Sequence, residues 1–111
     1  MKKDLKKAEV IEVLADIIND KADKHQEYFF CQAETNPAVA DAHKNLMLAY
    51  SCMAYEMQQK GFVTDGTWLI LCFLKKKYQE RHVEGTERIV WDNPFSEKGI
   101  QAFYDKALNS F

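Results

Sequence analysis

The chain has 111 residues, with 15 lysines and arginines against 17 aspartates and glutamates, so its net charge is −2. Hydrophobic residues make up 47% and charged residues 29%, which fits one folded domain over residues 1–111 and excludes a disordered chain. With 4 glycines and 2 prolines the collagen-like and low-complexity classes are excluded, and the charge balance gives no overall basic footprint for nucleic acid.

The first predicted helix runs from about Asp4 to about Cys31, a stretch without glycine or proline. Asp4 is the expected N-cap, and residues 34–36 are expected to break the chain. Apolar residues recur every three or four positions, the pattern of an amphipathic helix. The apolar face carries Ile11, Leu14, Ala15, Ile17, Ile18, Ala22, His25 and Phe29.

The second predicted helix has clear signals at both ends. Asn36 can cap it and Pro37 can take its first position, where a missing N–H costs nothing. Gly61 suits the left-handed residue after a helix, so we expect the helix to cover Pro37–Lys60.

This second helix carries two apolar rows. The main row is expected to face the core, and it consists of Val39, His43, Leu46, Tyr50, Met53 and Met57. A second row on the far side consists of Leu48, Cys52 and Tyr55. Either another helix covers this second row, or it is an exposed patch for a partner or a second copy of the chain.

The third predicted helix covers about Gly66–His82, with Thr64 or Asp65 as its cap. Residues 68–74 are apolar on every side, so a buried strand is the alternative, but leucines and the helix formers that follow favour a helix.

A connector ending at Asn93-Pro94 leads to the fourth predicted helix, about Glu97–Asn109, capped by Ser96. The sequence therefore predicts an all-α, small four-helix bundle-like domain with two long antiparallel helices plus two shorter ones.

Cysteine usage and hydropathy indicate the compartment. The chain has three cysteines, Cys31, Cys52 and Cys72, and no Cys-x-x-Cys pair. An odd number without such a pair favours free thiols in a reducing cytoplasm. The longest uncharged apolar run, residues 68–74, is far shorter than the ~20 residues that span a bilayer. No signal-peptide core follows the N-terminal lysines, so we expect a cytosolic protein without a membrane association.

No sequence motif supports an enzyme. Helical di-iron sites use Glu-x-x-His pairs, but the residues three positions before the histidines are Ala22, Ala40 and Gln79. There is no His-Glu-x-x-His motif, no Gly-rich phosphate loop and no local nucleophile–base signature. We therefore expect no catalytic residues, no cofactor and no metal.

Six carboxylates on the first helix form the sharpest feature of the sequence. Their spacings of 3, 4, 4, 3 and 4 residues place them within about 80° of one another on a helical wheel. This face must be polar in any amphipathic helix, but such a row is also suited to docking a basic partner. We call it the acidic row: Glu9, Glu12, Asp16, Asp20, Asp23 and Glu27.

A basic cluster lies near the end of the third helix, with Tyr78 and Trp91 nearby. Basic residues interleaved with aromatic ones are one footprint of nucleic-acid binding, although the same lysines also suit a solvated helix C-terminus. Three glutamates reduce the net charge of residues 75–88 to 5 − 3 = +2. The basic side chains are Lys75, Lys76, Lys77, Arg81 and Arg88.

These patterns favour a small cytosolic protein-binding module that acts by occupancy, such as an inhibitor, an immunity protein, an adaptor or a phage-type accessory protein. The acidic row would steer a partner protein with a basic surface, and the patch of Leu48, Cys52 and Tyr55 would add affinity or form a homodimer contact. The alternative is a nucleic-acid-binding regulator that uses the Lys75–Arg88 region.

Overall fold

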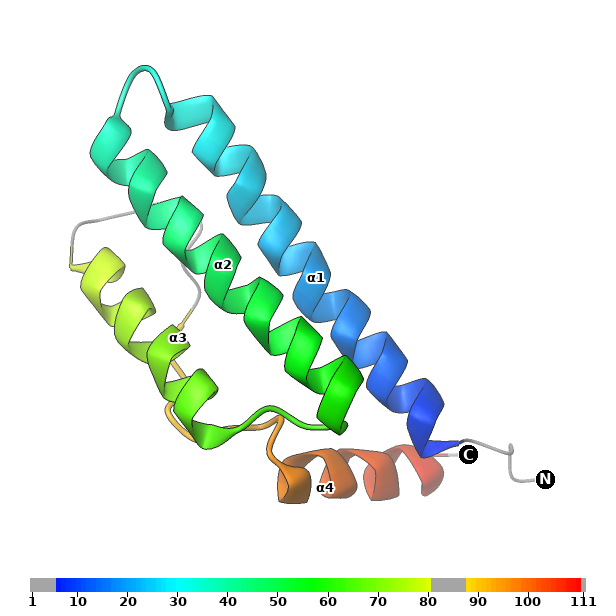
Figure 1. Cartoon of the computed structure of the whole chain (residues 1–111). Coiled ribbons are helices and arrows are strands. Elements are labelled where there is room, and N and C mark those ends of the chain that lie inside the picture. Colours follow the sequence, from blue (N-terminus) through cyan, green and yellow to red (C-terminus); the bar gives the residue numbers. More distant parts are fainter. Residues whose placement is uncertain (1–5, 81–87, 111) are drawn as a thin grey trace.

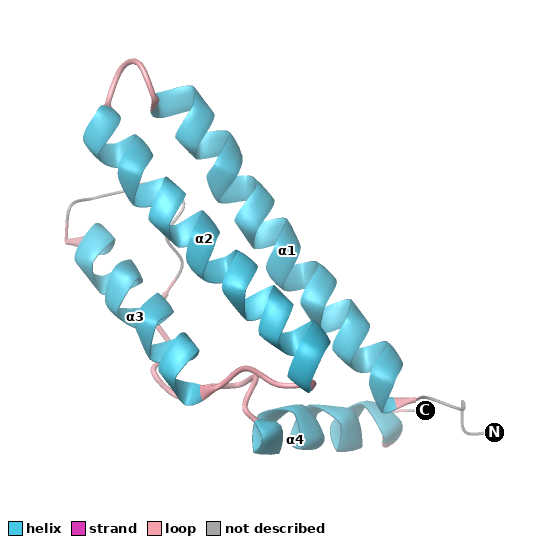
Figure 2. Cartoon of the chain, viewed as in Figure 1, coloured by secondary structure: helices cyan, strands magenta, loops and turns pink. Residues whose placement is uncertain are grey.

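The computed structural model describes residues 6–80 and 88–110 of the chain. Within these residues it contains four helices and no strand (Figure 2). The predicted all-α class is confirmed, and residues 68–74 are helical rather than extended. The first helix begins after Lys6 rather than after the predicted cap Asp4, and the third helix ends at Gln79 rather than at His82. Asp4 and His82 themselves lie outside the described residues. The helices are α1 (Lys7–Gln32), α2 (Pro37–Lys60), α3 (Asp65–Gln79) and α4 (Glu97–Leu108).

The long helices α1 and α2 form an antiparallel hairpin (Figure 1). Asn36 caps α2 by accepting a hydrogen bond from the N–H of Val39, and Pro37 occupies the first position. At the other end, Gly61 adopts a left-handed φ of 80° and donates its N–H to the carbonyl of Met57 at 2.9 Å. The predicted bounds of this helix are therefore confirmed, because both ends are set by residues beside them.

The shorter helix α3 lies beside α2 and runs back along it (Figure 1). Its N-cap is Thr64, whose hydroxyl hydrogen-bonds to the Glu56 carboxylate on α2 at 2.7 Å. The chain after α3 returns to the start of this helix, since Val63 donates to the carbonyl of Phe95 at 2.7 Å and Asn93 donates to the carbonyl of Val63 at 2.8 Å. We call residues 88–95 the connector.

Helix α4 crosses the end of the hairpin close to the start of α1 (Figure 1). Ser96 caps it by accepting a hydrogen bond from the N–H of Gly99 at 3.1 Å, as the sequence predicts. Ile100 is buried in the core, and the Lys7 ammonium on α1 donates to the Gln101 side chain at 2.6 Å. Helix α4 thus closes one end of the bundle.

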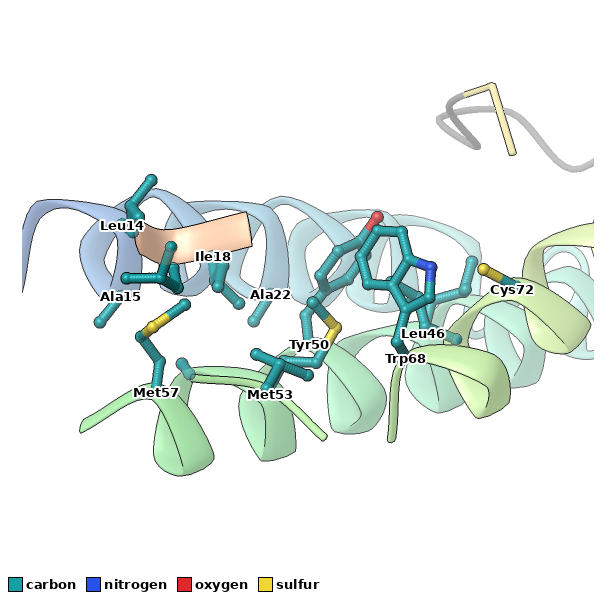
Figure 3. Packing of buried hydrophobic residues seen from close by; sticks show 14 of the residues in the cluster. Leu14, Ala15, Ile18, Ala22, Leu46, Tyr50, Met53, Met57, Trp68 and Cys72 are labelled. Atoms are coloured by element: carbon teal, nitrogen blue, oxygen red, sulfur yellow. The ribbon is translucent and has the colours of Figure 1, made fainter. Parts of the chain in front are cut away.

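Most of the core lies between α1 and α2. Small residues of α1, Ala15 and Ala22, leave room for the larger Leu46, Met53 and Met57 of α2 (Figure 3). Burying a large apolar side chain contributes about 1.5–3 kcal/mol, so this interface provides most of the stability of the hairpin. No helix in the described part of the chain is both long and apolar enough to cross a membrane.

Candidate functional site

The acidic row lies along an uninterrupted helix, because α1 spans Lys7–Gln32 without a break. All six of its carboxylate side chains are exposed. Two apolar side chains beside the row are exposed as well, Val13 at 57% and Ile17 at 46%. Ile17 was predicted to lie on the apolar face, and this prediction is wrong, because Ile17 lies at the edge of that face beside the acidic row. The outer face of α1 therefore combines aligned negative charge with apolar surface.

The patch of Leu48, Cys52 and Tyr55 is exposed, so the second apolar row of α2 is not covered by another helix in the described structure. Leu48 is 49% and Tyr55 is 64% exposed. The patch continues into an apolar groove against α3, where Ile70 and Leu74 form the opposite wall. Because the buried residues of α2 point towards α1, the patch points away from the acidic row.

The predicted basic cluster does not form one surface. Lys76, Lys77 and Arg88 are exposed, whereas Lys75 is only 6% exposed, and Arg81 lies outside the described residues. The ammonium of Lys75 instead lies 5.5 Å from the centre of the Tyr50 ring on α2, a cation–π contact.

The orientation of Lys75 follows from helical periodicity. The buried residues of α3 are Trp68, Leu71, Cys72, Lys75 and Tyr78. Their spacing of three and four residues defines one face, so the first lysine of the run falls on the inner side and its two neighbours do not. The same periodicity is visible in the sequence, and it could have predicted that Lys75 is buried while Lys76 and Lys77 are exposed.

A pocket of about 320 Å³ opens where α1, α2, α3 and the connector meet, and we call it the connector pocket. No pattern in the sequence predicted this pocket. Its aromatic and sulfur-containing walls come from Tyr50, Met53, Trp68, Cys72 and Phe95, and aliphatic residues complete the apolar lining. Three cationic side chains also line it: Lys21, Lys75 and Arg88.

Hydrogen bonds hold the connector against α3 at this pocket. The indole N–H of Trp68 is 3.0 Å from the carbonyl oxygens of both Val90 and Trp91, and the Cys72 thiol donates to the carbonyl of Val90 at 3.3 Å. The Trp68 ring also packs edge-on against Phe95, with 5.8 Å between ring centres. Figure 3 shows Trp68 and Cys72 on α3, with the Trp68 ring beside Tyr50 of α2.

The environment of the pocket changes the acidity of its thiol. Burial raises the pKa of Cys72 above its usual value, and the positive charge of Lys75 offsets part of that rise. A raised pKa keeps the thiol protonated near neutral pH, which makes Cys72 a poor nucleophile. Its chemistry in this position is that of a small apolar side chain that donates one weak hydrogen bond.

Two buried histidines form a second polar feature that the sequence did not reveal. Nδ1 of His25 lies 2.9 Å from Nδ1 of His43, and the His25 ring stacks on Tyr50 with 5.6 Å between centres. His25 is therefore a core residue, as its place on the apolar face indicates, but it is paired with a second histidine. The two residues are each nine positions from residue 34 in the hairpin turn, a symmetry that could have predicted their meeting.

No set of three or more His, Cys, Asp or Glu side chains in residues 6–80 and 88–110 is arranged to hold a metal ion. Comparisons with models of protein families, with curated proteins and with solved structures found no match to this chain. The proposed function therefore rests on the exposed surfaces of the protein.

Proposed function

We propose that the protein is a protein-binding module that acts by occupying a basic surface of its partner, with the acidic row as its docking face. The observation that supports this function is the exposure of all six carboxylates on one continuous helix. Aligned negative charge speeds the approach of a positively charged partner and selects against acidic ones. An inhibitor, immunity protein, adaptor or phage-type accessory protein would work in this way.

Lasting affinity needs apolar contact in addition to charge, because charge mainly sets the rate of association and the specificity. Exposed Val13 and Ile17 supply apolar surface directly beside the acidic row. The patch of Leu48, Cys52 and Tyr55 lies on the other side of the hairpin, so it suits a second contact, including one between two copies of the chain. A partner docked on the row would bury Val13 and Ile17 first.

Nucleic-acid binding through the Lys75–Arg88 region is the alternative function. It has less support, because Lys75 is buried against Tyr50 and only Lys76, Lys77 and Arg88 remain exposed among the described basic residues of the cluster. Nucleic-acid affinity would fall steeply with added salt as counterions are released from the phosphates.

The test starts from the protein that co-purifies with this chain in its native host, followed by measurement of the dissociation constant with purified components. The variant Asp16→Asn, Asp20→Asn, Asp23→Asn should weaken binding by about tenfold or more at low salt and reduce its salt dependence. A matched triple, Glu34→Gln, Asp41→Asn, Glu80→Gln, removes the same charge from exposed positions elsewhere and should leave affinity within about twofold.

Equal effects of the two triples would mean that only net charge matters, and no effect of either would exclude the acidic row as the docking face. A third variant, Lys76→Ala, Lys77→Ala, Arg88→Ala, addresses the alternative. If this variant alone loses binding, and the ligand is a nucleic acid, the protein is a nucleic-acid-binding regulator.

A further inference from the structure

The exposed apolar row of α2 continues onto α3 as one surface. Leu48, Cys52 and Tyr55 follow α2 with spacings of four and three residues, the repeat of a seam between two packed helices. Ile70 and Leu74 of α3 form the opposite wall of the groove beside this row. We call this surface the α2–α3 face, and it consists of Asn45, Leu48, Ala49, Cys52, Tyr55, Thr67, Ile70 and Leu74.

The α2–α3 face exposes apolar area on the scale that a dimer needs. Leu48, Tyr55 and Ile70 are 49%, 64% and 60% exposed. At about 200 Å² for a large side chain, these three residues alone expose roughly 350 Å². A dimer contact of standard size buries about 800 Å² on each partner, of which about 65%, or roughly 500 Å², is apolar. Cys52 and Leu74 add to the three, so the face supplies most of the required area.

The two helices of the α2–α3 face are in register about a common level. The Asn45 amide donates a hydrogen bond to the Tyr78 hydroxyl at 2.7 Å. The Thr67 hydroxyl donates to the Glu56 carboxylate at 2.8 Å. Because α2 and α3 run in opposite directions, the middle of α2 between these two bonds lies beside the middle of α3 (Figure 1).

The apolar residues are arranged symmetrically about this common level. Leu48 and Tyr55 lie on either side of Cys52 on α2, and Ile70 and Leu74 lie on either side of the same level on α3. A two-fold axis there would set Leu48 against Tyr55 of a second copy and the two Cys52 side chains against each other. It would set Ile70 against Leu74 in the same way. A two-fold contact must be self-complementary, and this arrangement meets that requirement.

The ends of the two helices complement each other in charge. Exposed Asp41 lies near the start of α2, and exposed Lys60 ends it. Exposed Asp65 begins α3, and exposed Lys77 lies in its last turn. Antiparallel pairing about the common level brings each aspartate to the level of the lysine at the other end of the same helix in the second copy. Such pairs favour this orientation and register over others.

We propose that the protein forms a two-fold symmetric dimer in which the α2–α3 face of one chain packs against the same face of a second copy. The patch points away from the acidic row, so the dimer would present two acidic rows on its outside. The contact does not depend on the proposed docking function, and a monomeric protein would leave that function untouched.

Sedimentation velocity of the full chain measures the contact. The protein should be a dimer with a dissociation constant below about 10 μM. Leu48→Glu and Ile70→Glu, one on each helix, should each weaken the dimer at least about tenfold, because each places a charge in the contact on both copies. The matched control is Leu69→Glu, at an exposed leucine of α3 that does not line the groove, and it should change the dissociation constant by less than about threefold. Circular dichroism checks that the variants keep their helices.

A cross-link tests the register. With Cys31 changed to serine, a short bismaleimide should join the Cys52 thiols of two copies, because both lie at the proposed axis. With Cys52 changed to serine instead, Cys31 should give no cross-link. Cys31 lies roughly 20 Å along the helices from the common level, so two copies would hold it about 40 Å apart. Cys72 is buried in both variants.

Three outcomes would overturn the proposal. A protein that is monomeric at about 100 μM would leave the α2–α3 face to a different protein. Equal weakening by Leu69→Glu and Leu48→Glu would place the contact elsewhere. A cross-link through Cys31 and none through Cys52 would exclude the two-fold register.

Discussion

Nδ1 of His25 lies 2.9 Å from Nδ1 of His43, so a hydrogen bond between two imidazole rings joins α1 to α2 inside the core. One Nδ1 must donate its proton and the other must accept it, which requires the accepting ring to be neutral. The ring of Tyr50 stacks on His25, and the ring of Tyr28 lies 4.8 Å from that of His43. The pair thus fixes the register of the hairpin at a polar point within an apolar interface.

Changing either histidine of this pair to leucine should lower the free energy of unfolding by about 1–3 kcal/mol, because the other ring loses the hydrogen bond between the two rings in a buried position. Changing both should cost less than the sum of the two single changes, since each single change already removes that same hydrogen bond. Urea unfolding of the two single variants and the double variant measures this coupling. Simple additivity would contradict an energetic pairing of His25 with His43.

Glu56 joins the end of α2 to the start of α3. Burial raises the pKa of its carboxyl group, but hydrogen bonds from Thr64 and Thr67 together with the charge of Lys60 lower it by more, so the net pKa lies below the ordinary value of 4.5. The hydroxyls of Thr64 and Thr67 lie 2.7 Å and 2.8 Å from the same carboxylate oxygen.

A carboxylate with a lowered pKa in the folded state stabilises the protein above its unfolded pKa, and that stabilisation disappears as the pH falls through the folded pKa. Glu56→Gln should therefore cost about 1–2 kcal/mol at pH 7 and progressively less as the pH drops below about 4. Urea unfolding across this pH range measures the difference. Glu12→Gln, at an exposed position, is the control and should change stability by only a few tenths of a kcal/mol.

The three cysteines should differ in reactivity. Cys31 and Cys52 are exposed, while Cys72 is buried and burial raises its pKa. Because the thiolate is the reactive form, a colorimetric thiol reagent near pH 8 should modify two thiols rapidly and the third at least about tenfold more slowly. Cys72→Ser should remove the slow phase, and a fast reaction of all three thiols would show that Cys72 is accessible.

Replacing three of the glycines by alanine should change the stability of the protein in different directions. Gly61→Ala should cost about 1 kcal/mol or more, because the residue has a φ of 80° and a new Cβ would meet Ile11. Gly99→Ala should destabilise the protein as well, since its Cβ would collide with the backbone carbonyl of Pro94. Gly66→Ala meets open space in the first turn of α3 and should stabilise by up to about 1 kcal/mol. Thermal unfolding should show lower midpoints for Gly61→Ala and Gly99→Ala, and a higher midpoint for Gly66→Ala, than for the unchanged protein.

The ends of α2 could be predicted to the residue from the sequence, because Asn36, Pro37 and Gly61 act on the backbone within a few positions of themselves. The acidic row could be predicted equally well, since alignment along a helix depends only on a repeat of 3.6 residues. The orientation of Lys75 was also present in that repeat, but the run of three lysines suggested an exposed cluster instead.

The sequence by itself determined the helices, the caps of α2 and α4 and the charge on the outer face of α1, because each depends on residues that are close together in the chain. Only the tertiary structure decided that the connector returns to Trp68 and Cys72, that His25 meets His43, and that three cations from separate segments line one pocket. These relationships join residues 13 or more positions apart, and they depend on how the helices pack rather than on local preference.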